Sequence, residues 1–279
     1  MRRKIPFGAA GIPTRVTEVR ARIDEQLLDA DDVPDVPVAM LTVTLLLWTA
    51  LHREWLPTPS TAGPAALSDP GVPETMGTQN GVAGVLAYLL LWGVLTSAAT
   101  YPALIPFVER YAANETGSRA GTIRAAVALL GSYSLTWAAT GVVPLAVDAL
   151  VNLAGAADRF GPVLVGGAAV LAGLYQLTTT KRDALARCVD CSSPSAHDLS
   201  VRDAAERGVE RALDSIRSTW ALFALLVVVG SLNLFWLLAV TAVATLERFA
   251  PRREEVAATV GAAAVLAGTA IAVAGALGA

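Results

Sequence analysis

The sequence predicts an all-α protein: a polytopic membrane helical bundle of about six transmembrane helices with cytoplasmic N- and C-termini. Three observations predict this fold class. Hydrophobic residues make up 54% of the 279 residues, and the mean hydropathy is +0.53. The charged residues gather in a few clusters, which is typical of membrane bundles rather than soluble domains. Between Arg217 and Glu247 no side chain is ionisable, and at ~1.5 Å per residue that stretch outspans the ~30 Å hydrocarbon core.

Residues 1–37 are predicted to form a cytoplasmic N-terminal arm ahead of a membrane domain at residues 38–279. Val16, Val19, Ile23 and Leu27 are three or four residues apart, which indicates a short amphipathic helix. This helix could lie on the membrane surface, against a partner, or on the bundle as a solvated arm. The arm has no apolar core of the signal-peptide type, so we expect it to be retained.

Six apolar segments are the predicted spans, at about 38–55, 81–106, 121–148, 160–180, 218–246 and 256–277. The linker at 56–80 is rich in Pro, Gly, Ser and Thr, and we expect no regular structure there. Pro102 and Pro106 should kink or end the second span. The sixth span is rich in Ala and Gly, with Gly261, Gly268 and Gly275, which predicts close backbone packing against a neighbour.

The fifth predicted span is expected to be one tilted helix. Asn233 would lie near its centre, where an amide in lipid needs a partner inside the protein. Residues at steps of three and four define the face expected to contact the other spans: Ser215, Thr219, Leu222, Leu226, Gly230, Asn233 and Leu237.

Six spans would place the N-terminal arm, the loop at 109–124, the cytoplasmic loop at 181–217 and the C-terminus on one side. That side holds sixteen of the 21 Lys and Arg residues, which predicts that it is cytoplasmic and fits a plasma-membrane protein. Arg248, Arg252 and Arg253 are the exception. In the long loop, Ser200 with Asp203 is typical of a helix start, and an apolar stripe then continues into the fifth span.

Three predicted spans share a framework of aromatic, proline and amide residues. The second span reads Trp92-Gly-Val-Leu-Thr-Ser-Ala98-Ala-Thr-Tyr-Pro102-Ala-Leu-Ile-Pro106, and the fourth ends with Tyr175-Gln176 before Lys181. The fifth contains Trp220-Ala-Leu-Phe223 and Gly230-Ser-Leu-Asn233-Leu-Phe-Trp236. In order, spacing and span position, these segments resemble the predicted metal-binding integral membrane family known as domain of unknown function 2182, over roughly residues 92–251.

The resemblance implies soft metal ligands at positions where this chain has other residues. Thiolate and thioether donors select Cu(I) and related soft metals, and hydroxyl or alkyl groups cannot replace them. We therefore interpret the chain as a ligand-depleted member of that family. The family's methionines fall at Leu95, Ala99, Thr100, Phe223, Leu232 and Leu237, and its cysteine cluster falls at Ser215, Ser218 and Thr219.

Uncharged polar residues remain in the predicted membrane interior, where they could line a polar cavity or hydrogen-bond one helix to another. No predicted span carries a buried acidic, basic or histidine side chain of the kind that marks ion pathways, and Asp148 and Glu247 are expected at the interface. The interior set is Thr96, Ser97, Thr100, Tyr101, Tyr175, Gln176 and Asn233.

Cys188 and Cys191, followed by His197, form the remaining cluster of donors. The spacing of the two cysteines suits a metal or a redox pair, and copper or zinc would be the candidate ions. The chain has no second pair to close a four-ligand zinc site, and reduced loop thiols are the alternative. The sequence thus predicts no cofactor outright.

We expect a non-catalytic membrane subunit or scaffold that works in the lipid bilayer beside another membrane chain, one that retains the Met and Cys ligands. The alternatives are a small-solute or ion permease and a metal-handling membrane protein. No nucleophile with a base, Walker loop or dinucleotide motif is visible, and no basic stripe suits nucleic acid.

Overall fold

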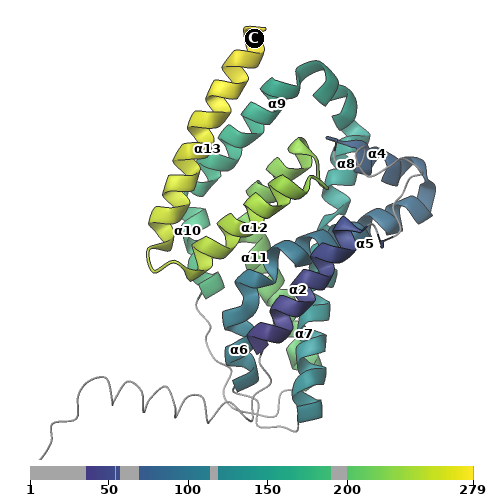
Figure 1. Ribbon diagram of the computed structural model, residues 1–279, viewed down its shortest axis with the longest axis vertical. Helices are drawn as coiled ribbons and strands as arrows, with labels where there is room; N and C mark the ends of the chain where they lie inside the picture. Colours follow the sequence, from purple (N-terminus) through teal and green to yellow (C-terminus); the bar gives the residue numbers. More distant parts are fainter. Residues whose placement is uncertain (1–35, 54, 57–68, 114–118, 190–199, 279) are drawn as a thin grey trace, which may run out of the picture. The chain divides into compact units, whose positions relative to one another are not determined.

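The computed structural model confirms that the chain is an all-α bundle. It describes all residues except 1–35, 54, 57–68, 114–118, 190–199 and 279, so the amphipathic helix predicted in the N-terminal arm lies outside it. Residues Val36–Ala279 form one compact unit. Its elements are α2 (Val36–His52), α4 (Val72–Gln79), α5 (Gly81–Thr100), η2 (Pro102–Leu104), α6 (Ile105–Ala113), α7 (Arg119–Thr140), α8 (Val142–Val151), α9 (Leu153–Gln176), α10 (Thr179–Val189), α11 (Val201–Val229), α12 (Leu234–Phe249) and α13 (Arg253–Ala276) (Figure 1).

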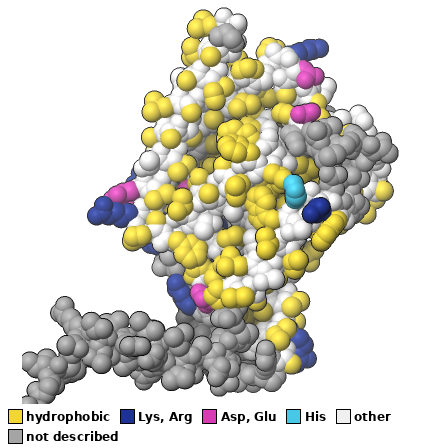
Figure 2. All heavy atoms as spheres, in the orientation of Figure 1, with side chains coloured by type: hydrophobic (Ala, Val, Ile, Leu, Met, Phe, Trp, Pro, Cys, Tyr) yellow, Lys and Arg dark blue, Asp and Glu magenta, His cyan; other side chains and the backbone are white. Residues whose placement is uncertain are grey.

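Among the described residues, five helices are long and apolar enough to cross a membrane: Gly81–Thr100, Ala120–Val151, Leu153–Gln176, Val201–Val229 and Arg253–Ala276. The apolar α2 is shorter. Figure 2 shows hydrophobic side chains over much of one face, with charged side chains in small groups toward its margins. This surface is compatible with a membrane protein, since lipid-facing side chains must be apolar.

The region around the second predicted span confirms one expectation and corrects another. Helix α5 ends at Thr100, and the chain continues through η2 and α6, so the prolines end the helix as predicted. The linker before α5 is not wholly irregular, because α4 begins there behind Gly71. Pro73 lies in the first turn of α4, where its missing N–H costs no helical hydrogen bond.

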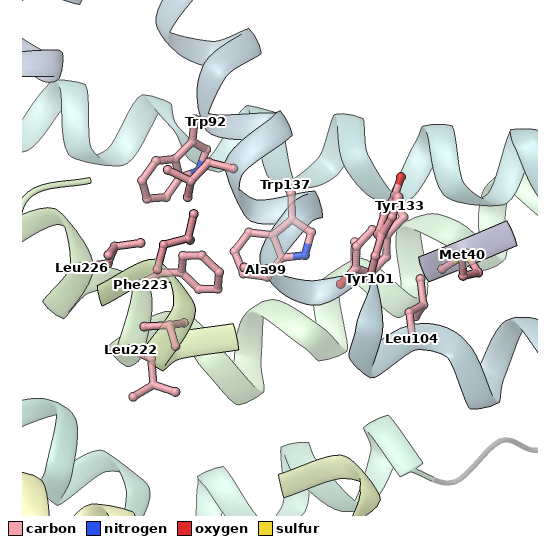
Figure 3. Close-up of a cluster of buried hydrophobic side chains, with 14 of the residues drawn as sticks. Met40, Trp92, Ala99, Tyr101, Leu104, Tyr133, Trp137, Leu222, Phe223 and Leu226 are labelled. Atoms are coloured by element: carbon pink, nitrogen blue, oxygen red, sulfur yellow. The ribbon is translucent and has the colours of Figure 1, made fainter. Parts of the chain in front are cut away.

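The core lies where α5, α7 and α11 meet. Helix α7 contacts both of the others, and Trp137 on α7 packs against Phe223 on α11 with ring centroids 4.8 Å apart. Trp92 on α5 contacts the same phenylalanine. Met40 on α2 joins this core beside Leu104 (Figure 3). The sulfur of Met40 therefore lies among apolar side chains.

Helices α9 and α13 pack with their backbones in close contact, as the glycines of the sixth span predict. A Cβ added at Gly268 would lie 2.6 Å from the carbonyl oxygen of Gly166, and one at Gly261 would lie 2.8 Å from that of Gly173. The residue numbers rise along one helix and fall along the other, so the two run antiparallel. Small residues permit such an approach in lipid, where dispersion contacts hold helices together.

The start of α11 confirms the predicted cap. Asp203 donates its backbone N–H to the Ser200 hydroxyl, and the Asp203 carboxylate accepts the N–H of Ser200, which completes a capping box. From there α11 runs without interruption for 29 residues. The loop helix and the first part of the fifth predicted span are therefore one element.

The prediction of a single helix over residues 218–246 is wrong, because the chain turns back in its middle. Helix α11 ends at Val229, and Gly230 has φ 110°, a conformation that a side chain would disfavour. The Asn233 side chain accepts from the backbone N–H groups of Phe235 and Trp236 and so caps α12. It occupies a helix end, where the sequence predicted an interhelical partner.

Because of this turn, α12 returns antiparallel beside α11. Arg248 on α12 contacts Ser215 on α11, although 33 residues separate them. The predicted packing face is otherwise largely buried, with Ser215, Leu226 and Leu237 all fully enclosed. Most of this face is buried as predicted, because the spacing of three and four residues holds within each of the two helices.

The turn also adds one pass to the predicted path of the chain. Arg248, and with it the nearby start of α13, lies at the same end of the bundle as Lys181. Helix α13 then runs back along α9, so Gly275 approaches Pro162 at the opposite end. The shared side predicted for both termini depended on an unbroken fifth span, and it does not follow from this topology. The exception of Arg248, Arg252 and Arg253 disappears, because these residues join the Lys181 end.

Candidate functional site

A buried polar cluster lies where α9, α10, α11 and α12 meet, and we call it the Lys181 network. The turn at Gly230 brings α12 back beside the middle of α11, at Ser215 and Ser218. The bend after α9 places α10 beside both helices. Its members come from segments up to 115 residues apart in the sequence. They are Tyr133, Gln176, Lys181, Cys188, Ser215, Ser218, Glu247 and Arg248.

The centre of the network is an ion pair. Lys181 Nζ lies 2.6 Å from Glu247 Oε2, and both side chains are fully buried. The ammonium also donates to the carbonyl oxygen of Ser218 at 2.5 Å, and the Gln176 amide donates to Glu247 Oε1 at 2.7 Å. Burial lowers the pKa of Lys181, while the neighbouring Glu247 carboxylate acts in the opposite direction. Each charge depends on the other for its compensation.

A second cation extends the network along α11. Arg248 Nη2 donates to Ser215 Oγ at 2.7 Å, and the Tyr133 hydroxyl donates to the same oxygen at 2.9 Å. The Cys188 sulfur lies 3.4 Å from Ser218 Oγ. The formal charge of Lys181, Arg248 and Glu247 together is positive by one, so the network is a poor environment for a further cation.

This geometry corrects the expectation that the predicted spans carry no buried acidic side chain, which treated Glu247 and Asp148 as residues at span ends. Both are buried, and Glu247 makes the pair described above. Lys181 and Glu247 were predicted on opposite sides of the membrane, because residues 218–246 were expected to form one unbroken helix. Gly230 followed three residues later by Asn233, within an apolar stretch, is the local signal that could have indicated a cap and hence a break.

A second buried group, the Glu74 cluster, lies near the C-terminal end of α11. It contains Glu74 and Thr75 of α4, Tyr88 of α5, Asp148 of α8 and Ser231 of the α11–α12 turn. Tyr88 donates to Glu74 Oε1 at 2.7 Å and Ser231 donates to the same atom, while Thr75 donates to Asp148 Oδ2 at 2.9 Å. Glu74 Oε2 is buried and has no hydrogen-bond partner among the described residues.

Burial raises the pKa of Glu74, and the nearby Asp148 charge acts in the same direction, against the hydrogen bonds from Ser231 and Tyr88. Glu74 was not predicted as a site residue, because the linker that contains it was expected to be irregular. The available signal was Pro73 followed by an acidic residue, the composition of a helix first turn.

The positions where the resemblance implies metal ligands are buried, except for Leu232, which is partly buried. Leu95 and Ala99 lie in the apolar core, and the Thr100 hydroxyl donates to the Thr96 carbonyl of its own helix. Ser215 and Ser218 belong to the Lys181 network, and Thr219 donates to the carbonyl oxygen of Ser215 at 2.7 Å. The hydroxyls are thus engaged in hydrogen bonds within the protein.

The remaining polar residues of the predicted interior make helix contacts. Ser97 donates to Ser134 at 2.8 Å, and the Tyr101 hydroxyl lies 2.7 Å from that same oxygen, which joins α5 to α7. Thr96 bonds the Trp92 carbonyl of its own helix. The Tyr175 hydroxyl donates to the backbone of Arg217, joining α9 to α11. The hydroxyls of Ser97, Tyr101 and Tyr175 thus join neighbouring helices, whereas that of Thr96 bonds within its own helix.

A soft-metal site would need several sulfur or imidazole donors together. In the part of the chain that the structure describes, no group of three His, Cys, Asp or Glu side chains is placed to hold an ion. Cys188 is described and buried, whereas Cys191 and His197 lie outside the described residues. The described residues therefore do not fit a copper site.

The fold and the two buried clusters define this protein as a helical membrane-type bundle with a closed polar network at one end. Comparison with known sequences gives the family. Residues 89–271, more than half of the chain, match the PpoB2 family, described as copper chaperones, and the chain belongs to that family. No curated protein matches the chain, and no solved structure does.

Proposed function

We propose that this chain is a non-catalytic subunit of a copper-handling complex in the plasma membrane, and that a second membrane chain supplies the copper ligands. One observation carries the proposal. Two of the three positions where the family resemblance implies cysteines are Ser215 and Ser218, which contact Lys181 and Arg248 in a buried, hydrogen-bonded network. A site with these two cations and no thiolate cluster disfavours Cu(I) both by charge and by donor type.

The test is copper analysis of the protein extracted from its native membrane in a mild detergent, with identification of the chains that accompany it. We expect copper to elute with a partner rich in membrane Met and Cys, and to be absent from this chain once the two are separated. Stoichiometric copper on this chain alone would overturn the proposal.

A triple variant tests the chain's own candidate donors, one of which, Cys188, belongs to the Lys181 network. Cys188→Ser combined with Cys191→Ser and His197→Ala removes the chain's own candidate donors. We expect the copper content of the complex to stay unchanged. A loss of copper in this variant would instead favour the second reading, metal handling by the chain itself through those three residues.

A permease is the third candidate, and the Glu74 cluster favours it. A buried carboxylate beside the end of an interrupted helix is an arrangement that transporters use to hold ions. Ion and solute flux into proteoliposomes tests it, with Glu74→Gln and Gln176→Ala as variants. Flux that both variants abolish would replace the subunit proposal, and equal leak in all three preparations would exclude this candidate.

A further inference from the structure

An apolar groove of about 430 Å³ runs along α11 on the outer side of the core. We call it the α11 groove, and its walls include Trp92, Trp137, Trp220, Phe223 and Val228. It is open at the surface, since Val143 on its rim is 64% exposed. An open apolar groove of this kind in a membrane-crossing segment faces the hydrocarbon of the bilayer.

The groove has almost no polar chemistry to offer a ligand. Thr140 lines it, but its hydroxyl donates to the Trp137 carbonyl at 2.6 Å and accepts the Trp92 indole N–H at 3.0 Å. The other lining side chains are aliphatic or aromatic. A ligand segment bound here must therefore be hydrocarbon, because any buried polar group would lose its hydrogen bonds to water without replacement.

The length of the groove matches one leaflet. Its α11 wall extends from Ile216 to Val228, which at 1.5 Å per residue is ~18 Å. Half of the ~30 Å hydrocarbon core is about 15 Å. A chain lying in the groove would thus start at the membrane surface and end near the midplane.

One end of the groove carries the groups that membrane surfaces favour. Arg217 is the last charged residue before the apolar stretch, and its side chain is 59% exposed in a loose contact of 3.4 Å with Asp214. Trp220, Ala224 and Val228 follow it at steps of three and four, so all four share one helix face. Trp220 is 48% exposed and packs edge-on against Tyr175 at 4.8 Å. Trp and Tyr side chains near the end of a membrane-crossing segment are typical of the headgroup level of the bilayer.

We propose that the α11 groove binds one acyl chain of an anionic phospholipid, with the headgroup phosphate at Arg217. Three features fit an anionic phospholipid: the groove has a hydrocarbon lining, it is as long as one leaflet, and a cation with aromatic neighbours lies at one end. A free isoprenoid tail would use the groove but not the cation. The inference is independent of copper and of the proposed partner chain.

Native mass spectrometry of the full chain tests the proposal. The purified protein is stripped of lipid in detergent and offered equal amounts of phosphatidylglycerol and phosphatidylcholine with identical acyl chains. We expect one phosphatidylglycerol to stay bound at detergent concentrations that remove the rest. Replacing Ala224, an exposed wall residue, by Trp should abolish this binding, because the larger side chain fills the groove.

The matched control is Ala263→Trp, an exposed position of α13 outside the groove, which should bind as the unmodified protein does. Arg217→Glu is a second, exposed variant that should not affect folding. It should lower the preference for phosphatidylglycerol by at least about five-fold, because it removes one basic residue near an anionic surface, worth about that factor, and adds an acidic one. The proposal fails if Ala224→Trp and Ala263→Trp bind alike, if Arg217→Glu keeps the preference, or if the retained molecule contains no phosphate.

Discussion

At the scale of single residues, the most consequential are charges buried in a helical bundle. Lys181 and Glu247 are completely enclosed and compensate one another, with Gln176 as a further donor. The opposite case is Glu74, whose second carboxylate oxygen is buried without a partner among the described residues. An ionised group in that state is costly, so the two sites should respond differently to substitution.

Lys181→Met should destabilise the protein by about 3–5 kcal/mol, because it leaves the Glu247 charge buried and unpaired. The double variant Lys181→Met with Glu247→Gln should recover much of this loss, since no net charge then remains in the pair. Thermal unfolding in detergent measures both. Arg202→Ala, which removes an exposed ion pair with Glu206, is the control and should change little. A double variant no more stable than Lys181→Met would contradict the expected coupling.

Glu74→Gln should alter how stability depends on pH. The raised pKa means that the Glu74 carboxyl keeps its proton to higher pH in the folded protein than in the unfolded chain, whose ordinary value is 4.5. Its contribution is therefore fully present below that value and is lost as the pH rises through the raised pKa. Unfolding midpoints from pH 4 to pH 8 should fall with pH for the unmodified protein and fall less for Glu74→Gln. An exposed control, Glu109→Gln, should keep the original slope, and an unchanged slope in Glu74→Gln would refute the assignment.

At the scale of elements, glycines decide how closely α9 and α13 approach. Gly166 and Gly167 are neighbours on α9 with opposite surroundings. A Cβ at Gly166 would lie 2.5 Å from the Gly268 carbonyl oxygen and 2.6 Å from the backbone nitrogen of Ala272, whereas one at Gly167 would meet nothing within 4 Å. The pair is therefore a natural matched comparison.

Gly166→Ala should destabilise the bundle by about 1–3 kcal/mol, because the two backbones must separate to admit the methyl group. Gly167→Ala should be neutral or stabilise the helix by up to about 1 kcal/mol through its higher helix propensity. Chemical unfolding in mixed detergent and denaturant distinguishes them. If both variants gain stability equally, α9 and α13 are not in backbone contact in the membrane.

At the scale of the whole molecule, the turn at Gly230 sets which loops share a side. The sequence analysis placed residues 247–255 opposite the loop at 181–217. In the structure Arg248 contacts Ser215 and Ser218, so both regions lie at one end, and the end of α13 lies at the other. The enriched positive charge of the loop then extends to Arg252 and Arg253, in line with the bias expected for a cytoplasmic side.

Single cysteines introduced into a chain with Cys188 and Cys191 replaced by Ser test this arrangement. Cysteines at Arg202 and Arg252 should react with an impermeant maleimide from the same side of sealed vesicles, and one at Gly278 from the opposite side. Permeabilised vesicles, in which all three should react, provide the control for accessibility. If Arg252→Cys is labelled from the side opposite to Arg202→Cys, the result contradicts the turn at Gly230 and supports an unbroken fifth span.

The candidate site was only partly predictable. The resemblance pointed to Ser215, Ser218 and Thr219, and the structure places all three in the buried interior. It could not point to Lys181, Glu247 or Arg248 as their neighbours, because these come from other helices. Similarly, helical spacing identified Leu226 and Leu237 as packing residues but could not reveal the turn between them.

The sequence by itself determined that the chain is an all-α bundle with helices able to cross a membrane, because apolar length and three- to four-residue spacing are local properties. It also determined the capped start of α11 and the close packing of the glycine-rich last helix. Only the tertiary structure decided that Gly230 turns the chain back, that Lys181 meets Glu247, and that Glu74 is buried. Such pairings join residues far apart in the sequence, and no local pattern specifies which distant side chain will compensate a buried charge.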